Sequence, residues 1–118
     1  MIIYVSIGLG KTTYCKSHPN CCDADYYNYI NSNYKSYKDY VTEMNKLYDI
    51  VFINHIEGIN HIDKAYLAEN FNMILSRITN RNYKVIPNKE IFIEEHKIFP
   101  NAIILKENQY LSDIFKEE

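Results

Sequence analysis

Two short segments of the chain are apolar at nearly every position, and loop-forming residues follow each of them. One segment runs from Met1 to Ser6 and the other from Asp49 to Asn54. Runs of this kind, rich in β-branched residues, are typical of strands that are buried on both faces of a parallel sheet. We therefore predict that the two segments form parallel, adjacent strands at the centre of a sheet.

A helical spacing of apolar residues appears between Tyr34 and Leu47. The apolar positions recur at intervals of three and four, at Tyr37, Tyr40, Val41, Met44 and Leu47. This spacing predicts a helix with one apolar face. The residues from Lys11 to about Ser17 fit two further helical turns, because Pro19 closes that segment.

Weaker patterns predict the remaining elements. We expect short strands at Asn20–Ala24, Tyr83–Ile86 and Ala102–Leu105, helices at Ile62–Asn70 and Asn88–Phe99, and a terminal helix or turn at Gln109–Phe115. Residues 71–78 fit either a strand or a helical continuation. Strands that alternate with helices predict one α/β domain over residues 1–118 with three layers, in which helices cover both faces of a mostly parallel sheet of about four to five strands.

Charge and composition exclude several classes of function but add little about the fold. The net charge of -2 argues against broad binding to nucleic acid or to an anionic membrane. No apolar stretch approaches the roughly twenty residues that span a bilayer, and we expect no signal peptide because the apolar start ends at Lys11. Cys15, Cys21 and Cys22 make a poor disulfide framework. We expect reduced thiols and a cytoplasmic location, in the host cytoplasm if the chain is viral.

Tyrosines crowd one stretch of the chain, at Tyr26, Tyr27, Tyr29, Tyr34, Tyr37 and Tyr40. Heavy use of Tyr, Asn, Ile and Lys is most simply the product of an AT-rich genome. Two functional interpretations stay open beside this one. The tyrosines would stack nucleobases, or the stretch Tyr26–Tyr40 would form the contact surface for a protein partner.

The most informative segment reads Ser-Ile-Gly-Leu-Gly-Lys-Thr-Thr and lies between a predicted strand and a predicted helix. A phosphate-binding loop needs glycines that turn successive backbone N–H groups toward one anion, a lysine for the outer phosphates, and a Ser or Thr that holds Mg²⁺. Gly8 and Gly10 supply the turn, Lys11 the charge and Thr12 the hydroxyl.

With these residues the chain resembles P-loop nucleotide kinases, particularly the small nucleoside monophosphate kinase-like proteins of phages and large viruses. The resemblance rests on Gly8–Thr13, on Asp23-Ala24-Asp25 and on Asp49 to His55, roughly the first half of the chain. It implies a reduced P-loop fold that uses ATP and Mg²⁺. By the resemblance, the nucleotide would be held by Gly8, Leu9, Gly10, Lys11, Thr12 and Thr13. Thr12 and Asp23 would hold the metal, and Asp25 would orient or deprotonate the acceptor.

The chain departs from that family at two places. Val5 stands where the usual loop has its first glycine, and Asn54 and His55 stand where the third strand usually ends in an acid. The second departure removes the usual second anchor of Mg²⁺. Both departures weaken the expectation of catalysis.

Phosphoryl transfer also needs cations that close over the phosphates. Arg77 and Arg81 are four residues apart, so a helix would place both on one face, either as a phosphate clamp or as a solvated basic face. His55 and His61 flank Gly58 and fit a metal site or an acid–base pair, although incidental loop residues explain them better.

Two functions from different classes remain open. The first is ATP- and Mg²⁺-dependent phosphoryl transfer to a nucleotide or another small acceptor, with Lys11, Asp25, Arg77 and Arg81 in the catalytic roles. The second is an inactive P-loop-like domain that binds another protein, for example a virus-encoded inhibitor of a host system. We favour the first function and expect no membrane association.

Overall fold

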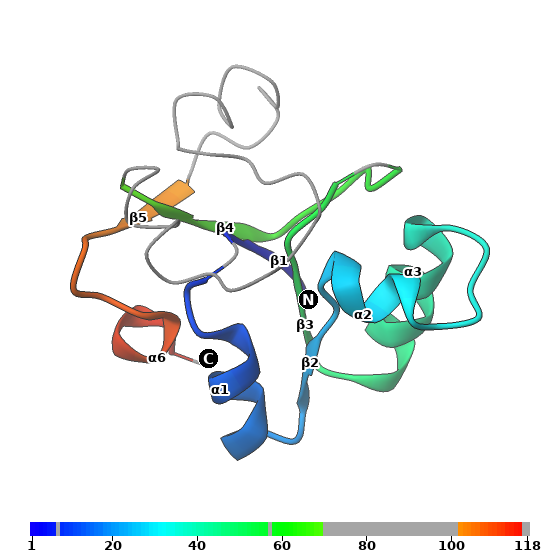
Figure 1. Ribbon diagram of the computed structural model, residues 1–118, viewed down its shortest axis with the longest axis horizontal. Helices are drawn as coiled ribbons and strands as arrows, with labels where there is room; N and C mark the ends of the chain where they lie inside the picture. The colour runs from blue at the N-terminus through cyan, green and yellow to red at the C-terminus, as the bar shows by residue number, and fades with distance from the viewer. Residues whose placement is uncertain (7, 57, 70–101, 117–118) are drawn as a thin grey trace.

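The computed structural model describes residues 1–6, 8–56, 58–69 and 102–116 of the chain (Figure 1). Five strands form one sheet, in which every paired strand is parallel and the order is β2-β3-β1-β4-β5. The strands are β1 (Ile2–Val5), β2 (Cys21–Asp23), β3 (Ile50–Ile53), β4 (Lys64–Ala68) and β5 (Ala102–Leu105). Because β1 and β3 are parallel neighbours inside the sheet, the predicted central pair and the α/β class are confirmed.

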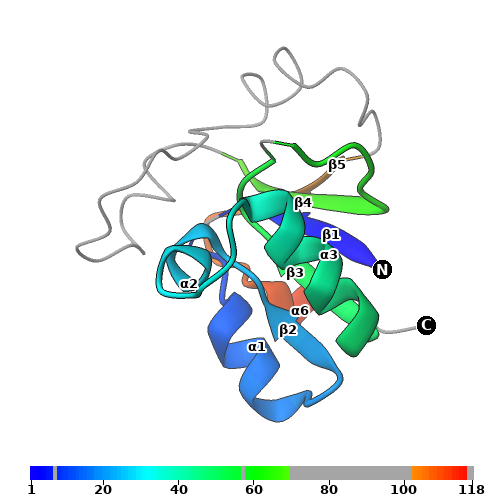
Figure 2. The ribbon, with the colours of Figure 1, turned by 90° about the vertical axis from the view of Figure 1, so that its right-hand side faces the viewer.

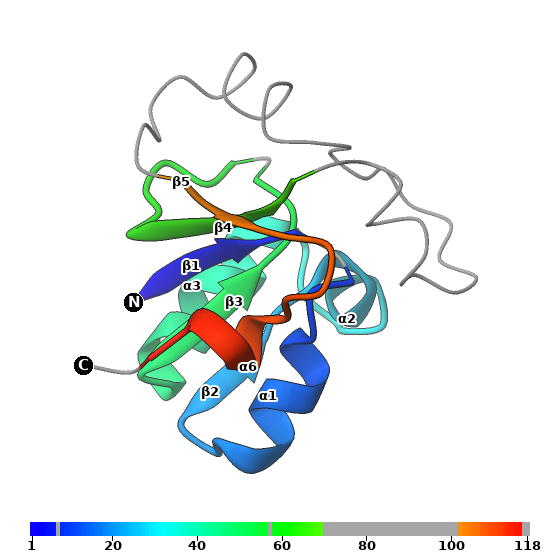
Figure 3. The ribbon, with the colours of Figure 1, turned by 90° about the vertical axis from the view of Figure 1, so that its left-hand side faces the viewer.

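Helices cover both faces of this sheet, as predicted. Helices α1 (Lys11–Ser17) and α6 (Leu111–Ile114) lie on one face (Figure 3), and α2 (Tyr26–Ile30) and α3 (Tyr37–Leu47) lie on the other (Figure 2). Successive strand residues point to opposite faces, so β3 sends Phe52 toward α1 and α6, and Val51 and Ile53 toward α3. An apolar residue at every position is what such a doubly covered strand requires.

The prediction of a helix over Ile62–Asn70 is wrong, because this segment contains strand β4. Ala and Leu in the segment are good helix formers, and no strict alternation signals a strand. Pairing with neighbours on both edges outweighs that local preference: β4 joins β1 at Tyr4↔Ala65 and β5 at Tyr66↔Ile103.

The helix predicted from Tyr34 begins later, at Tyr37. Ser36 is its N-cap, and its hydroxyl accepts the N–H of Asp39 at 3.1 Å. Most of the predicted apolar face packs on the sheet, but Leu47 at the last position is 67% exposed. Before α3 the chain forms the five-residue helix α2, which apolar spacing did not predict.

Several predictions fall on residues 70–101, outside the described residues. They are the strand at Tyr83–Ile86, the helix at Asn88–Phe99, the ambiguous segment 71–78, and the pair Arg77 and Arg81. The predicted strand at Ala102–Leu105 is present as β5, and the terminal helix within Gln109–Phe115 is present as α6. None of the helices described is long and apolar enough to cross a membrane.

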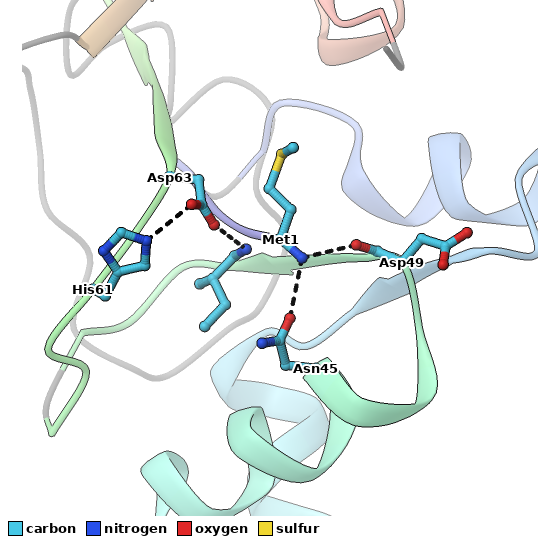
Figure 4. A network of polar contacts seen from close by, with 6 residues as sticks. Met1, Asn45, Asp49, His61 and Asp63 are labelled. Carbon is cyan, nitrogen blue, oxygen red and sulfur yellow. Dashed lines mark hydrogen bonds and ion pairs between the residues drawn. The ribbon is translucent and has the colours of Figure 1, made fainter.

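Polar contacts fasten the amino ends of the strands (Figure 4). The amino group of Met1 donates to the Asn45 side chain at 3.2 Å and to the Asp49 carbonyl at 2.8 Å. Asp63 accepts the N–H of Ile2 at 2.8 Å and contacts His61 Nε2 at 2.9 Å. These contacts join β1 to the segments before β3 and β4, at the end of the sheet opposite to the phosphate-loop motif.

Candidate functional site

The carboxyl ends of β1, β2 and β3 meet at one edge of the sheet, and their loops diverge there. The chain leaves β1 for α1 on one face, whereas it leaves β2 for α2 and α3 on the other face. In open parallel sheets, ligands bind in the crevice where connections separate to opposite faces. The segments after these three strands carry most of the predicted site residues.

The loop between β1 and α1 turns at its two glycines. Gly8 has a φ of 84° and Gly10 a φ of 91°, values that side chains other than hydrogen disfavour. Leu9 between them is fully buried in the core on the α1 and α6 face. Its carbonyl accepts the N–H of Leu111 at 2.7 Å. The Leu9 side chain therefore anchors the loop to the core. In the predicted phosphate site, Leu9 would take part only through its backbone.

Lys11 is 4% exposed and is not a solvated surface lysine. Its ammonium lies 3.5 Å from the carbonyl oxygen of Val5, so the side chain folds back across the loop to the end of β1. Val5, which replaces the usual first glycine, packs its own side chain in the core and presents its carbonyl to Lys11. The buried ammonium group of Lys11 therefore brings a positive charge to the carboxyl end of β1.

Thr12 and Asp23 are brought together as the sequence predicts. The Thr12 hydroxyl on the first turn of α1 donates to Asp23 Oδ2 at the end of β2, over 2.6 Å. Both are hard oxygen ligands, and Mg²⁺ in nucleotide sites takes one or two protein oxygens beside water and phosphate. The described residues contain no cluster of three or more His, Cys, Asp or Glu side chains that would hold a metal by themselves. The pair thus fits a Mg²⁺ ion that arrives with a nucleotide.

Asp25 and Asn54 hold the amino end of α2. Asp25 is 2% exposed, and its Oδ1 accepts the N–H of Asn28 at 2.8 Å. Asn54 is 8% exposed, and its Oδ1 accepts the N–H of Tyr26 at 2.8 Å. Asn54 therefore uses its side-chain oxygen for the helix, at the position where the resembled kinases carry an acid. Asp25, which was predicted to contact the phosphate acceptor, is therefore also the N-cap of α2.

An open pocket of about 390 Å³ lies between α1 and α2 beside the Thr12–Asp23 pair. Its lining residues are Thr12, Cys15, Lys16, Asp23, Asp25, Tyr27 and Asn28. Lys16 was not among the predicted site residues, although its position four residues after Thr12 places both on one helix face. Asn28 was not among them either, and its side-chain amide donates to the Asp23 carbonyl at 2.7 Å.

The cysteines near this pocket are not activated thiols. The pKa of Cys15 is raised to about 12, chiefly by burial and also by Asp23 and Cys22, against the opposing effect of Lys11. Burial and the charge of Asp23 likewise raise the pKa of Cys22 to about 11. Thiolate nucleophiles need a lowered pKa, so neither residue fits that role.

The remaining candidates do not line this pocket or lie outside the described residues. Thr13 is exposed on α1, and Arg77 and Arg81 are not among the described residues. His61 contacts Asp63 at the amino end of the sheet, whereas the ring of His55 packs on Tyr26 with centroids 4.4 Å apart. The two histidines thus have separate surroundings.

Compared with known proteins, the chain matches no family model, and no curated protein or solved structure is significantly similar to it. The kinase resemblance therefore stays an expectation from the motifs.

Proposed function

We propose that this chain binds a Mg²⁺–nucleoside triphosphate at the carboxyl edge of its sheet and transfers a phosphoryl group to a small acceptor. The observation that carries the proposal is the 2.6 Å contact between Thr12 and Asp23 beside the buried Lys11. A hydroxyl and a carboxylate from two elements meet there, and the buried Lys11 and a turn with two glycines in the left-handed region directly precede Thr12 along the chain. Such a set suits the charges of a metal–polyphosphate complex.

Each residue has a role that follows from its chemistry. Lys11 neutralises the outer phosphates, and the backbone from Gly8 to Thr13 surrounds them with N–H donors. Thr12 and Asp23 hold Mg²⁺, which would supply positive charge to the phosphate oxygens. Lys16 adds a second cation at the pocket wall. Asp25 positions the acceptor from the base of the same pocket, and Arg77 and Arg81 stay candidates for covering the transferred group.

One observation favours the alternative, a non-catalytic domain that binds a protein partner. Tyr27 and Ile30 lie one turn apart on α2 and are 49% and 54% exposed. Exposed aromatic and aliphatic side chains of this kind are typical anchors of protein interfaces. Within the tyrosine stretch, Tyr37 and Tyr40 are buried instead, so an interface would use only part of it.

The test is phosphate transfer from Mg·ATP to a panel of nucleoside monophosphates. Thr12→Val keeps the shape of the side chain but removes the hydroxyl, and we expect it to lower the rate about 10²–10³-fold. Thr42→Val is the matched control, since Thr42 is exposed on α3 and should leave the rate unchanged.

Transfer that is unaffected by Thr12→Val would refute the proposed site. No transfer by the native chain, together with a partner interaction that Tyr27→Ala and Ile30→Ala abolish, would establish the binding alternative.

A further inference from the structure

A second pocket, of about 350 Å³, lies on the other side of α2 and has a different chemistry. Aromatic rings and two lysines dominate its walls: Tyr26, Tyr29, Tyr37, His55, Lys35 and Lys38. Tyr27 and Asn28 face the first pocket, whereas Tyr26 and Tyr29 face this one, so α2 separates the two. The volume is in the range of small-molecule sites.

The aromatic wall is fixed by packing. The ring of His55 lies 4.4 Å from that of Tyr26 and meets Tyr37 edge-on at 5.3 Å. Tyr29 packs 5.3 Å from Tyr26 and 5.6 Å from Tyr37. Tyr37 is itself 4% exposed, and its hydroxyl donates to the Ala24 carbonyl. Because these rings hold one another in place, a planar ligand would meet a preformed surface.

The charge of the pocket is positive. Lys35 and Lys38 are exposed and flank Ser36, the N-cap of α3, where the helix dipole adds partial positive charge. No acidic side chain is among the described residues that line it. Gly58 closes the pocket with a φ of 80°, and a Cβ atom there would lie 3.3 Å from the Cβ of Lys38. The glycine thus lets the loop after β3 approach the lysine stem closely.

We propose that this pocket binds a small aromatic anion, with its ring against Tyr26, Tyr29 and His55 and its acidic group at Lys35 and Lys38. Stacking on aromatic side chains selects the ring, and the two lysines select the negative charge. Nucleoside monophosphates and other aromatic phosphates share this chemistry. The site uses none of the residues of the Thr12–Asp23 pair, so it does not depend on phosphoryl transfer.

Nuclear magnetic resonance of the His55 ring tests the proposal directly. The probes are adenosine 5′-monophosphate, 1-naphthyl phosphate, adenosine and inorganic phosphate, each added without Mg²⁺. We expect one or both aromatic phosphates to shift the His55 signal through ring currents, with saturation below about 1 mM, and adenosine or inorganic phosphate to bind at least about tenfold more weakly. A response to both aromatic phosphates indicates a general aromatic anion site, and a response to the nucleotide alone indicates a base-selective one.

Two double variants test whether binding depends on Lys35 and Lys38 themselves or only on the net charge of the chain. Lys35→Ala combined with Lys38→Ala should weaken binding at least about tenfold, because two cations at the acidic group are lost. Lys46→Ala combined with Lys106→Ala removes the same charge from exposed positions elsewhere and should leave binding unchanged. All four lysines are exposed, so both variants should fold, which far-ultraviolet circular dichroism checks.

Three results would overturn the proposal. The first is a His55 signal that neither aromatic phosphate shifts at about 5 mM, a concentration far above the range of a specific site. The second is inorganic phosphate that binds as tightly as the aromatic phosphates. The third is an equal loss of binding in the Lys35/Lys38 and the Lys46/Lys106 double variants.

Discussion

Tyr37→Phe tests how the edge of the sheet is held together. The Tyr37 hydroxyl donates to the carbonyl of Ala24, after β2, and the backbone of Asn54, after β3, hydrogen-bonds to it. Burial raises the pKa of Tyr37 well above 10.0, so the hydroxyl stays a donor at all ordinary pH values. Phenylalanine keeps the ring but leaves a buried carbonyl without this donor, which costs about 1–3 kcal/mol.

The assay is thermal and urea unfolding of the two proteins. In a domain of this size about 1 kcal/mol shifts the melting temperature by about 4 °C, so we expect a drop of about 4–12 °C. Tyr48→Phe is the control, because Tyr48 is 37% exposed at the end of α3 and should change stability by less than about 0.5 kcal/mol. A Tyr37→Phe protein as stable as this control would refute the view that the hydroxyl joins β2 to β3.

Other perturbations test separate parts of the structure. Leu111→Ala should cost about 2–5 kcal/mol in urea unfolding, because Leu111 is fully buried where α6 meets the loop after β1; a cost below about 1 kcal/mol would contradict this packing. Cys15 and Cys22 should react with iodoacetamide at pH 8 about a hundredfold or more slowly than in the urea-unfolded chain, since their pKa values rise from 9.0 to about 12 and about 11; equal rates would be inconsistent with burial. Burial raises the pKa of Asp63, but hydrogen bonds from His61 and Ile2 and nearby positive charges outweigh it and lower the pKa below 3.8. The ionised form is therefore favoured in the folded state, so its stabilising effect is complete above about pH 3.8 and is lost as the pH falls through the lowered folded value. In unfolding measured as a function of pH, the Asp63→Asn protein should therefore lack the part of the acid-induced loss of stability that Asp63 causes. The same acid dependence in both proteins would contradict this role of Asp63.

The first half of the fold was predictable because its signals are local. Helix α1 has the predicted bounds, since a glycine pair and a proline enclose it. Strands β1 and β3 follow from apolar runs that only a doubly covered sheet can bury. The proximity of Thr12 to Asp23 follows in turn, because the carboxyl ends of all strands in a parallel sheet lie at one edge.

The errors arose where distant partners decide the structure. Strand β4 is set by pairing on both sides, and no local spacing distinguishes it from a helix. Helix α2 has only five residues, and the side chain that caps Tyr26 comes from Asn54, far along the chain. The capping use of Asn54 was likewise invisible in the sequence, whereas the position of Lys16 beside Thr12 was readable from helical spacing.

In the proposed function, Lys11 and the loop around it bind a Mg²⁺–nucleoside triphosphate. Isothermal titration calorimetry of Mg·ATP with the native chain and with Lys11→Met measures this binding and the part that Lys11 plays in it. Methionine approximates the volume of this buried side chain and removes its charge. Lys46→Met, on the exposed face of α3, is the matched control.

We predict that the native chain and Lys46→Met bind Mg·ATP alike. Lys11→Met should bind about 10- to 150-fold more weakly, which corresponds to the loss of one charge-assisted contact worth about 1.5–3 kcal/mol. Thermal unfolding without ligand confirms that the Lys11→Met protein is folded at the temperature of the titration. No heat of binding from the native chain at millimolar Mg·ATP, or equal affinities of the two methionine variants, would contradict the claim.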